Sequence, residues 1–200
     1  PASGATDLVA RTVTQRVAAD LGQQLVVDNK PGAGGTLGTA EAAKAAPDGY
    51  TLLLTTSSTH AISPHLMPKL AYDPRKDFTP VAHVADAPSV LLVTNSLPVK
   101  TVGELIAYAK AHPGKLNYAT SGNGTIVHLN TAAFSAQAGV EMTHIPYKGT
   151  ALAIPDLIAG QTHVLFDSLP TGMPHAKAGR LRALAVTSEK RSTLAPELPT

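Results

Sequence analysis

Residues 119–129 read ATSGNGTIVHL, and this stretch does most to decide the fold that we expect. Small, hydroxyl-bearing and glycine residues stand directly before a helical pattern, so backbone N–H groups should be free at the positive end of a helix. Residues 1–7, PASGATD, have the same design near the start of the chain. We call residues 1–7 the first cradle and residues 119–125 the second cradle. Two such cradles predict a clamp around an anion.

The elements that surround the two cradles follow the same order. After the first cradle we expect a helix over 7–21, a strand at 25–27, a glycine loop at 29–35, a helix over 36–46 and a strand at 51–54. After the second cradle we expect a helix over 125–138, a strand at 142–145, a loop at 146–149, a helix over 150–159 and a strand at 163–166. The chain therefore repeats one α/β unit.

This alternation predicts an α/β fold with mostly parallel sheets, which bind ligands outside the carboxyl ends of their strands. Strands at 90–94 and 183–187 suggest two crossings between lobes, near 94–98 and 186–189. We expect lobe 1 to contain 1–95 and 188–200, lobe 2 to contain 96–187, and the crossings to form a hinge. Because residue 1 opens on a loop that needs a strand before it, we also expect the fold to be truncated at both termini.

Composition excludes several classes of function. The chain has 16 Lys and Arg against 14 Asp and Glu, scattered along its length, so it lacks the basic stripe of a nucleic-acid-binding protein. It has no cysteine, which excludes thiol catalysis and disulfides, and only 4% aromatic residues, which leaves few stacking surfaces for sugars or bases. Apolar runs such as 90–93 are too short to span a bilayer. A small charged ligand remains.

Five motifs in this order resemble the Bug/TctC family, the extracytoplasmic solute receptors of tripartite tricarboxylate transporters. They are Ser3-Gly4-x-x-Asp7, NKPGAGG at 29–35, PDGYTLL at 47–53, SGNGTxxHL at 121–129 and PYKGT at 146–150. The likeness covers essentially the whole chain. It implies a two-lobed type II periplasmic-binding-protein fold, a periplasmic location, and capture of a small organic anion: a dicarboxylate, a tricarboxylate, an acidic amino acid or an aromatic acid. It also implies membrane permease partners, and we expect no cofactor, no enzymatic activity and a monomer.

Two residues depart from the family's usual pattern. Ser3-Gly4 replaces a Gly-Gly pair, which adds a hydroxyl beside the ligand carboxylate or changes the reach of the loop. Thr125 replaces the more usual Ser, which keeps the hydroxyl and adds a methyl group. Both substitutions affect which acid fits.

The cradle residues expected to contact the ligand, largely through their backbone, are Ser3, Gly4, Ser121, Gly122, Gly124 and Thr125. The alternative is a purely structural strand-to-helix turn, in which glycines and hydroxyl caps are common. Asp7 is favoured in a first helical turn by the dipole alone, and beside a carboxylate it either points away, acts through water or meets a ligand ammonium group. His128 either packs at the base of its loop or touches the ligand.

Further ligand contacts are expected where strands end: Ser57, Ser58 and Thr59 in the first half, and Tyr147, Lys148, Gly149 and Asp167 in the second. Lys148 would pair with a distal carboxylate or stay solvated, and Tyr147 would supply a wall or a hydroxyl. Asp167 would bind a ligand amine, a water or a neighbouring backbone N–H. The other seven histidines show no metal-ligand spacing and are assigned to packing or the surface.

Enzyme functions receive little support. The glycine loop at 29–38 has Leu37 where a dinucleotide-binding loop needs its third glycine, and no acidic residue ends the next strand. A hydrolase triad of Ser121, His128 and Asp167 is conceivable, but nothing in the spacing places the imidazole against the hydroxyl. The effector domain of a transcription regulator shares the bilobal fold, but no helix-turn-helix occurs. Solute capture is the leading hypothesis.

Overall fold

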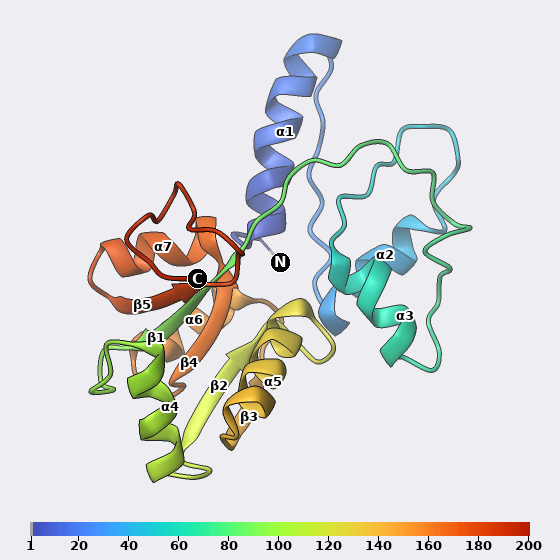
Figure 1. The fold of residues 1–200 in the computed structure, drawn as a ribbon. Coiled ribbons are helices and arrows are strands. Elements are labelled where there is room, and N and C mark those ends of the chain that lie inside the picture. Colours follow the sequence, from blue (N-terminus) through green and yellow to red (C-terminus); the bar gives the residue numbers. More distant parts are fainter. Residues whose placement is uncertain (1) are drawn as a thin grey trace.

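The computed structural model describes residues 2–200 (Figure 1). The described residues begin with α1 (Ala5–Leu21), a single 3₁₀ turn η1 (Ala33–Gly35), α2 (Thr36–Ala42), a π-helical turn η2 (Ser58–Ile62) and α3 (Ser63–Leu66). An α/β layer follows, with β1 (Ser89–Thr94), α4 (Val102–Ala111), β2 (Leu116–Thr120), α5 (Ile126–Ala138), β3 (Met142–Pro146), α6 (Thr150–Ile158), β4 (Val164–Ser168), α7 (Leu169–Lys177) and β5 (Leu181–Val186).

The strands form one mixed sheet in the order β3-β2-β4-β1-β5. β2 runs parallel to β3 and β4, whereas β1 runs antiparallel to both of its neighbours, β4 and β5. Because β5 then runs in the same direction as β2, β3 and β4, the sheet is mostly parallel, as expected, and β1 alone among its five strands runs the other way. The reason is that β1 enters at the edge where the parallel strands end, with Ser89 beside Ser168.

Two hydrophobic clusters cover the faces of this sheet. Val90 and Leu92 of β1 pack toward α6 and α7, while Leu91 and Val93 pack toward α4 and the end of α5. Successive side chains of a strand point to opposite faces, so a continuous apolar run produces a strand that is buried on both sides. Ala195 and Leu198 join the first cluster, which attaches the segment 188–200 to this sheet. The division into two lobes stays a prediction.

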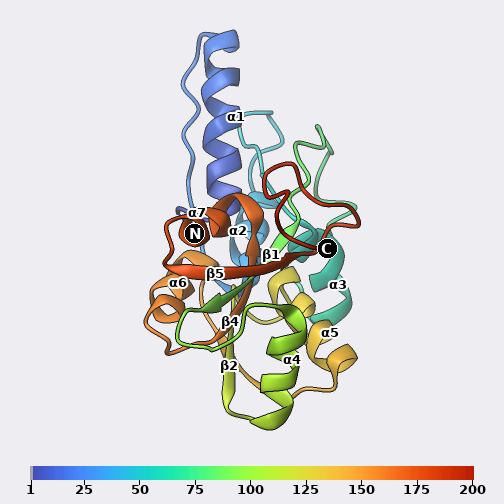
Figure 2. The same cartoon turned by 60° about the vertical axis from the view of Figure 1, so that its left-hand side comes forward.

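The first half contains helices but no strand among residues 2–88. The segment at 22–31 runs back alongside α1 (Figures 1 and 2), and Val26 within it is 90% exposed. The expected strands at 25–27 and 51–54 are absent, because no described neighbour supplies the ladder of hydrogen bonds that a strand needs. The helix expected over 36–46 ends at Ala42.

No helix among residues 2–200 is long and apolar enough to cross a membrane.

Candidate functional site

Three loops meet at the edge of the sheet where β2, β3 and β4 end. The register pairs Thr120 with Pro146, and β4 ends at Ser168, which is the N-cap of α7. Because these strands are parallel, the residues that follow them share one edge, as the alternating pattern of the sequence predicts.

The glycine loop of the first half packs against the second cradle at this edge. A Cβ placed on Gly122 would lie 3.5 Å from the backbone N of Gly34 and 3.5 Å from the backbone O of Tyr147. A Cβ placed on Gly34 would lie 3.0 Å from the Thr125 methyl carbon. Main chain therefore approaches main chain across the two halves, a contact that glycine permits.

Several backbone N–H groups of the second cradle and of the start of α5 have partners within the protein. Gly122 N–H donates to Thr120 Oγ1 at 3.2 Å, and Gly124 N–H donates to His128 Nδ1 at 3.2 Å. Ile126 N–H donates to Ser58 Oγ at 3.0 Å, and Thr125 Oγ1 accepts from His128 N–H at 3.4 Å. The expectation that the cradle amides are free is therefore wrong for Gly122 and Gly124, because nearby side chains accept from them.

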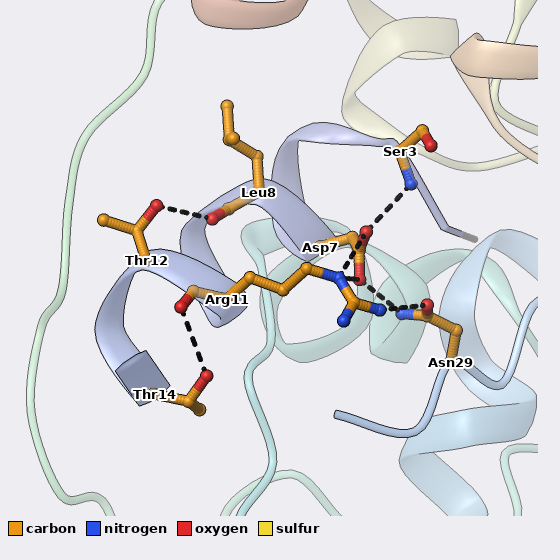
Figure 3. A network of polar contacts seen from close by, with 7 residues as sticks. All are labelled: Ser3, Asp7, Leu8, Arg11, Thr12, Thr14 and Asn29. Carbon is orange, nitrogen blue, oxygen red and sulfur yellow. Dashed lines mark hydrogen bonds and ion pairs between the residues drawn. The ribbon is translucent and has the colours of Figure 1, made fainter. Parts of the chain in front are cut away.

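The first cradle is organised by Asp7, whose carboxylate is buried (Figure 3). It accepts hydrogen bonds from Ser3 N–H at 2.9 Å and Asn29 Nδ2 at 3.0 Å, and it forms an ion pair with Arg11 at 3.0 Å. Asp7 therefore points into the protein and fixes the loop against the segment at 22–31, while its role toward a ligand stays a prediction. The hydrogen bond from Arg11 has the largest effect on the pKa of Asp7, and together these bonds lower that pKa to about 2.

A cavity of about 720 Å³ lies between the first cradle and the second half. Ser3 lines it from one side, and Thr150, Asp167, Thr171 and His175 line it from the other, with Arg180 also at its wall. Its apolar walls come from α6: Ala151, Ile154, Pro155 and Ile158. The cavity brings together two of the expected site residues, Ser3 and Asp167. The residues of the second cradle do not line it.

Two helices begin beside this cavity with no side-chain cap. Gly4 precedes α1 and Gly149 precedes α6, and neither helix has a side-chain hydrogen bond at its N-cap. By contrast, Thr125 caps α5. The first N–H groups of a helix lack intrahelical partners and carry its positive partial charge, so α1 and α6 offer the cavity two anion-binding ends.

Asp167 is 2% exposed and accepts a hydrogen bond from Thr171 Oγ1 at 2.8 Å. Burial raises the pKa of its carboxyl group, while hydrogen bonds from Thr150 and Thr171 oppose that shift. The Nδ1 atom of His175, in the same wall, is buried without a partner among the described residues.

The other expected residues take different positions. The Tyr147 hydroxyl donates to Asp156 at 2.6 Å, and the Tyr147 side chain packs against the first hydrophobic cluster. Lys148 is exposed. Ser57 is exposed as well, whereas Ser58 and Thr59 are buried in η2, where the Tyr72 hydroxyl donates to the backbone O of Thr59. Ser121 Oγ lies 3.1 Å from Thr125 Oγ1, inside the second cradle. The role of Ser58 as a cap was not foreseen, because no local pattern signals a contact across 68 residues.

No cluster of His, Asp or Glu suitable for a metal ion occurs among residues 2–200.

Comparison with known proteins agrees with this arrangement. The family model described as "Tripartite tricarboxylate transporter family receptor", TctC, matches residues 9–200. The chain belongs to this family. TctC proteins are receptors of a transport system rather than enzymes, and a periplasmic transporter superposes on the whole chain with 43% identity and a TM-score of 0.97.

Further relatives share the same fold. BugT of Bordetella pertussis is 41% identical over 100% of this chain and 62% of its own length. Rpa4515 of R. palustris, solved with adipate, is 41% identical with a TM-score of 0.97, covering 100% of this chain and 67% of that one. MatC of Rhodopseudomonas palustris, solved with malate, is 36% identical with a TM-score of 0.92, covering 98% and 67%. The chain spans 59 to 62% of the length of three curated relatives that it matches, BugT among them.

Proposed function

We propose that the protein is a solute receptor that holds one small organic carboxylate in the cavity between the first cradle and the start of α6. The observation that carries this proposal is the cavity of about 720 Å³ that Ser3 and Thr150 line from opposite sides, each next to an uncapped helix N-terminus. Partial positive charges of about half an elementary charge at each of two helix ends suit a carboxylate. The relatives solved with adipate and malate support this ligand class.

The polar contacts of Asp7 remove an objection to this site. A bare carboxylate in the first turn of α1 would repel a bound anion. Asp7 instead shares its charge with Arg11 and accepts from Ser3 N–H and Asn29, so its role is to shape the first cradle. A carboxylate ligand then meets backbone N–H groups and no uncompensated negative charge from this residue.

Asp167 and Thr150, in the cavity wall, determine which further polar groups the ligand can have. Because burial favours the neutral form of Asp167, its carboxyl group is able to donate to a ligand oxygen. The ionised form would accept from a ligand hydroxyl or ammonium group instead. The aliphatic wall of α6, with Ile154 and Ile158, packs against the carbon chain of the ligand. Dicarboxylates, hydroxy acids and acidic amino acids therefore fit better than aromatic acids.

Capture proceeds by closure of the two halves. A ligand shifts a conformational equilibrium only through contacts that differ between the states. A carboxylate that touches both Ser3 and Thr150 makes those contacts only when the halves meet, as they do here at Gly34 and Gly122. The closed protein, a monomer in the periplasm, then delivers its ligand to the membrane permease components of a tripartite transporter.

The test is a calorimetric binding screen on the whole protein, with adipate, malate, glutamate and citrate against glucose and NAD. We expect at least one acid to bind and neither glucose nor NAD to do so. An Ala151→Asp variant places a negative charge in the first turn of α6 at the cavity, and it should abolish carboxylate binding while the helix gains a favourable dipole interaction.

The matched control is Gly103→Asp, which introduces the same charge at the second residue of α4, away from the cavity. It should leave binding intact. Equal affinity in the Ala151→Asp variant and the unmodified protein would exclude this cavity as the site.

A further inference from the structure

The cavity of the proposed site extends along the whole of α6. Its lining residues on this helix recur on one face, from Thr150 in the first turn to Ile158 at the end. With a rise of about 1.5 Å per residue, these two residues lie about 12 Å apart along the helix axis. A ligand that begins at the N-terminus of α6 therefore has room to continue along the helix.

α7 forms the opposite wall and runs in the same direction as α6. The strands β3, β4 and β5 share one direction, so the two helices that connect them in turn both return from the carboxyl edge of the sheet. Asp167, Thr171 and His175 line the cavity at successive turns, and Arg180 lies just beyond the end of α7. The cavity thus has a near end, at the first cradle, and a far end, at Ile158 and Arg180.

Interactions between the lining residues support this order. At the near end, burial raises the pKa of Asp167, and a hydrogen bond from Thr150 opposes that shift. Toward the far end, burial and then the charge of Arg180 lower the pKa of His175, while Asp167 opposes that shift. His175 is therefore neutral at neutral pH, and Arg180 is the permanent cation of the far end.

Arg180 has no carboxylate partner within the described chain. None of the ion pairs among residues 2–200 involves it, and its side chain is exposed, so it can reorient without disturbing the core. A guanidinium group presents its N–H donors in one plane and binds a carboxylate through two of them. Lys148, which we expected to meet a distal carboxylate, does not line this cavity, whereas Arg180 does.

The stretch between the two ends is apolar. Ile154 and Pro155 of α6 form one side of it, and the Thr171 hydroxyl on the other side already donates to Asp167 at 2.8 Å. A charged group buried here would lose its hydration without gaining a partner. A methylene chain instead buries its own apolar surface against these side chains. The cavity therefore suits a ligand with an aliphatic chain between two anionic groups.

We infer that the protein selects long aliphatic α,ω-dicarboxylates, and that Arg180 is the specificity-determining residue that binds the second carboxylate. The inference rests on the proposed function, which places the first carboxylate between Ser3 and Thr150. A short dicarboxylate leaves its second charge in the apolar stretch, whereas a longer one brings it to the far end. We expect adipate and suberate to bind about tenfold more tightly than succinate, as one additional charge-assisted hydrogen bond implies.

The experiment is calorimetric titration of the whole protein with succinate, adipate, suberate and hexanoate at neutral pH. Hexanoate has the chain length of adipate but lacks the second carboxylate, so it reports on the near end alone. It should bind about tenfold more weakly than adipate. Arg180→Gln should weaken adipate binding by about three- to tenfold and change hexanoate binding by less than about twofold.

The matched control is Lys177→Gln. Lys177 is exposed in the last turn of α7 and does not line the cavity, so this variant removes the same charge from the neighbourhood without touching the far end. It should keep the adipate-to-hexanoate ratio of the unmodified protein. A purely structural role of Arg180 would lower the affinity for both acids equally, which the ratio distinguishes.

A second variant tests the far end by repulsion. Ile158→Glu introduces a carboxylate there, and because Ile158 is 36% exposed, the fold should tolerate it, as thermal unfolding will check. This variant should weaken the binding of adipate and suberate by about three- to tenfold and leave that of hexanoate unchanged.

Hexanoate that binds as tightly as adipate to the unmodified protein would overturn the inference. An unchanged adipate-to-hexanoate ratio in Arg180→Gln, or an equal change of that ratio in Lys177→Gln, would do the same. If malate or citrate binds but a longer chain brings no gain, the inference fails and the proposed function stands. If no carboxylate binds at all, the proposed function fails as well.

Discussion

The hydroxyl of Ser58 accepts a hydrogen bond from the backbone N–H of Ile126 at 3.0 Å, although 68 residues separate the two. Ser58 thus caps α5 from another part of the chain. The same N–H is one of those that an isolated helix would leave open to solvent or to a bound anion. When the first half contacts the sheet through Ser58, it therefore also supplies the hydrogen-bond acceptor for the first N–H group of α5.

Removing this cap should destabilise the protein. Ser58→Ala leaves Ile126 N–H without its partner, and loss of a hydroxyl cap costs about 0.5 to 2 kcal/mol of unfolding free energy. Ser57→Ala, at the exposed neighbour, should change it by less than about 0.5 kcal/mol. Urea denaturation of both variants measures the difference. Equal stability would mean that the Ser58 contact does not persist in solution.

The protein should lose stability in acid partly through Asp7. Its pKa in the folded state is about 2, below the ordinary value of 3.8, so its contribution is fully present above about pH 4. That contribution disappears as the pH falls from about 4 toward 2, because the carboxylate must then be protonated in the folded state. Asp7→Asn should flatten this part of the pH profile of denaturant midpoints. Asp20→Asn, in an exposed pair with Arg16, should leave the profile unchanged.

Ser3 adopts a backbone conformation that glycine prefers, with φ at 62°. Ser3→Gly should relieve that strain, worth about 1 kcal/mol, although the freer unfolded chain offsets part of the gain. We expect a net rise in stability of up to about 0.5 kcal/mol, whereas Ser3→Val should lower it because a β-branched residue fits this region poorly. Thermal unfolding ranks the three proteins. A less stable glycine variant than valine variant would contradict the strained conformation.

Gly122 and Gly103 should respond oppositely to alanine. Gly122 has φ at 125° and lies against Gly34 and Tyr147, so Gly122→Ala should cost about 1 to 3 kcal/mol of stability. Gly103 lies in α4, where an added Cβ meets nothing nearer than Thr101 Oγ1 at 4.0 Å, so Gly103→Ala should add about 0.5 to 1 kcal/mol. Denaturation of the two variants in parallel checks the signs. A neutral Gly122→Ala would show that residue 122 does not keep this positive φ in solution.

Local signals predicted much of the second half. Gly139 ends α5 in the left-handed conformation and Thr125 begins it, both as expected from the sequence. The apolar run of β1 and the strands β3, β4 and β5 were also predicted within a few residues. α7 was missed, because Pro170 and Pro174 inside Leu169–Lys177 suggest breaks although a proline fits the first helical turn.

Non-local features could not be predicted in the same way. Whether residues 25–27 form a strand depends on a partner elsewhere, and the direction of β1 depends on where the chain enters the sheet. At the site, the sequence predicted where the cradle loops lie. It did not predict which of their backbone N–H groups would donate hydrogen bonds to other groups of the protein. Thr120, Ser58 and His128 decide that through contacts between separate elements. The ligand-binding residues themselves stay predictions.

The exposed segment at 79–87 is the single covalent connection between residues 2–78 and the sheet within the described chain (Figure 1). A linker of this kind limits how far residues 2–78 can lie from the sheet, but it does not fix how they are oriented relative to it. The angle at which the first half docks on the sheet is therefore determined by noncovalent contacts. These are the approach of Gly34 to Gly122 and the hydrogen bond from Ile126 N–H to Ser58 Oγ. Substitutions at Gly34, Gly122 or Ser58 would therefore change how the first half docks on the sheet, without any change to the linker.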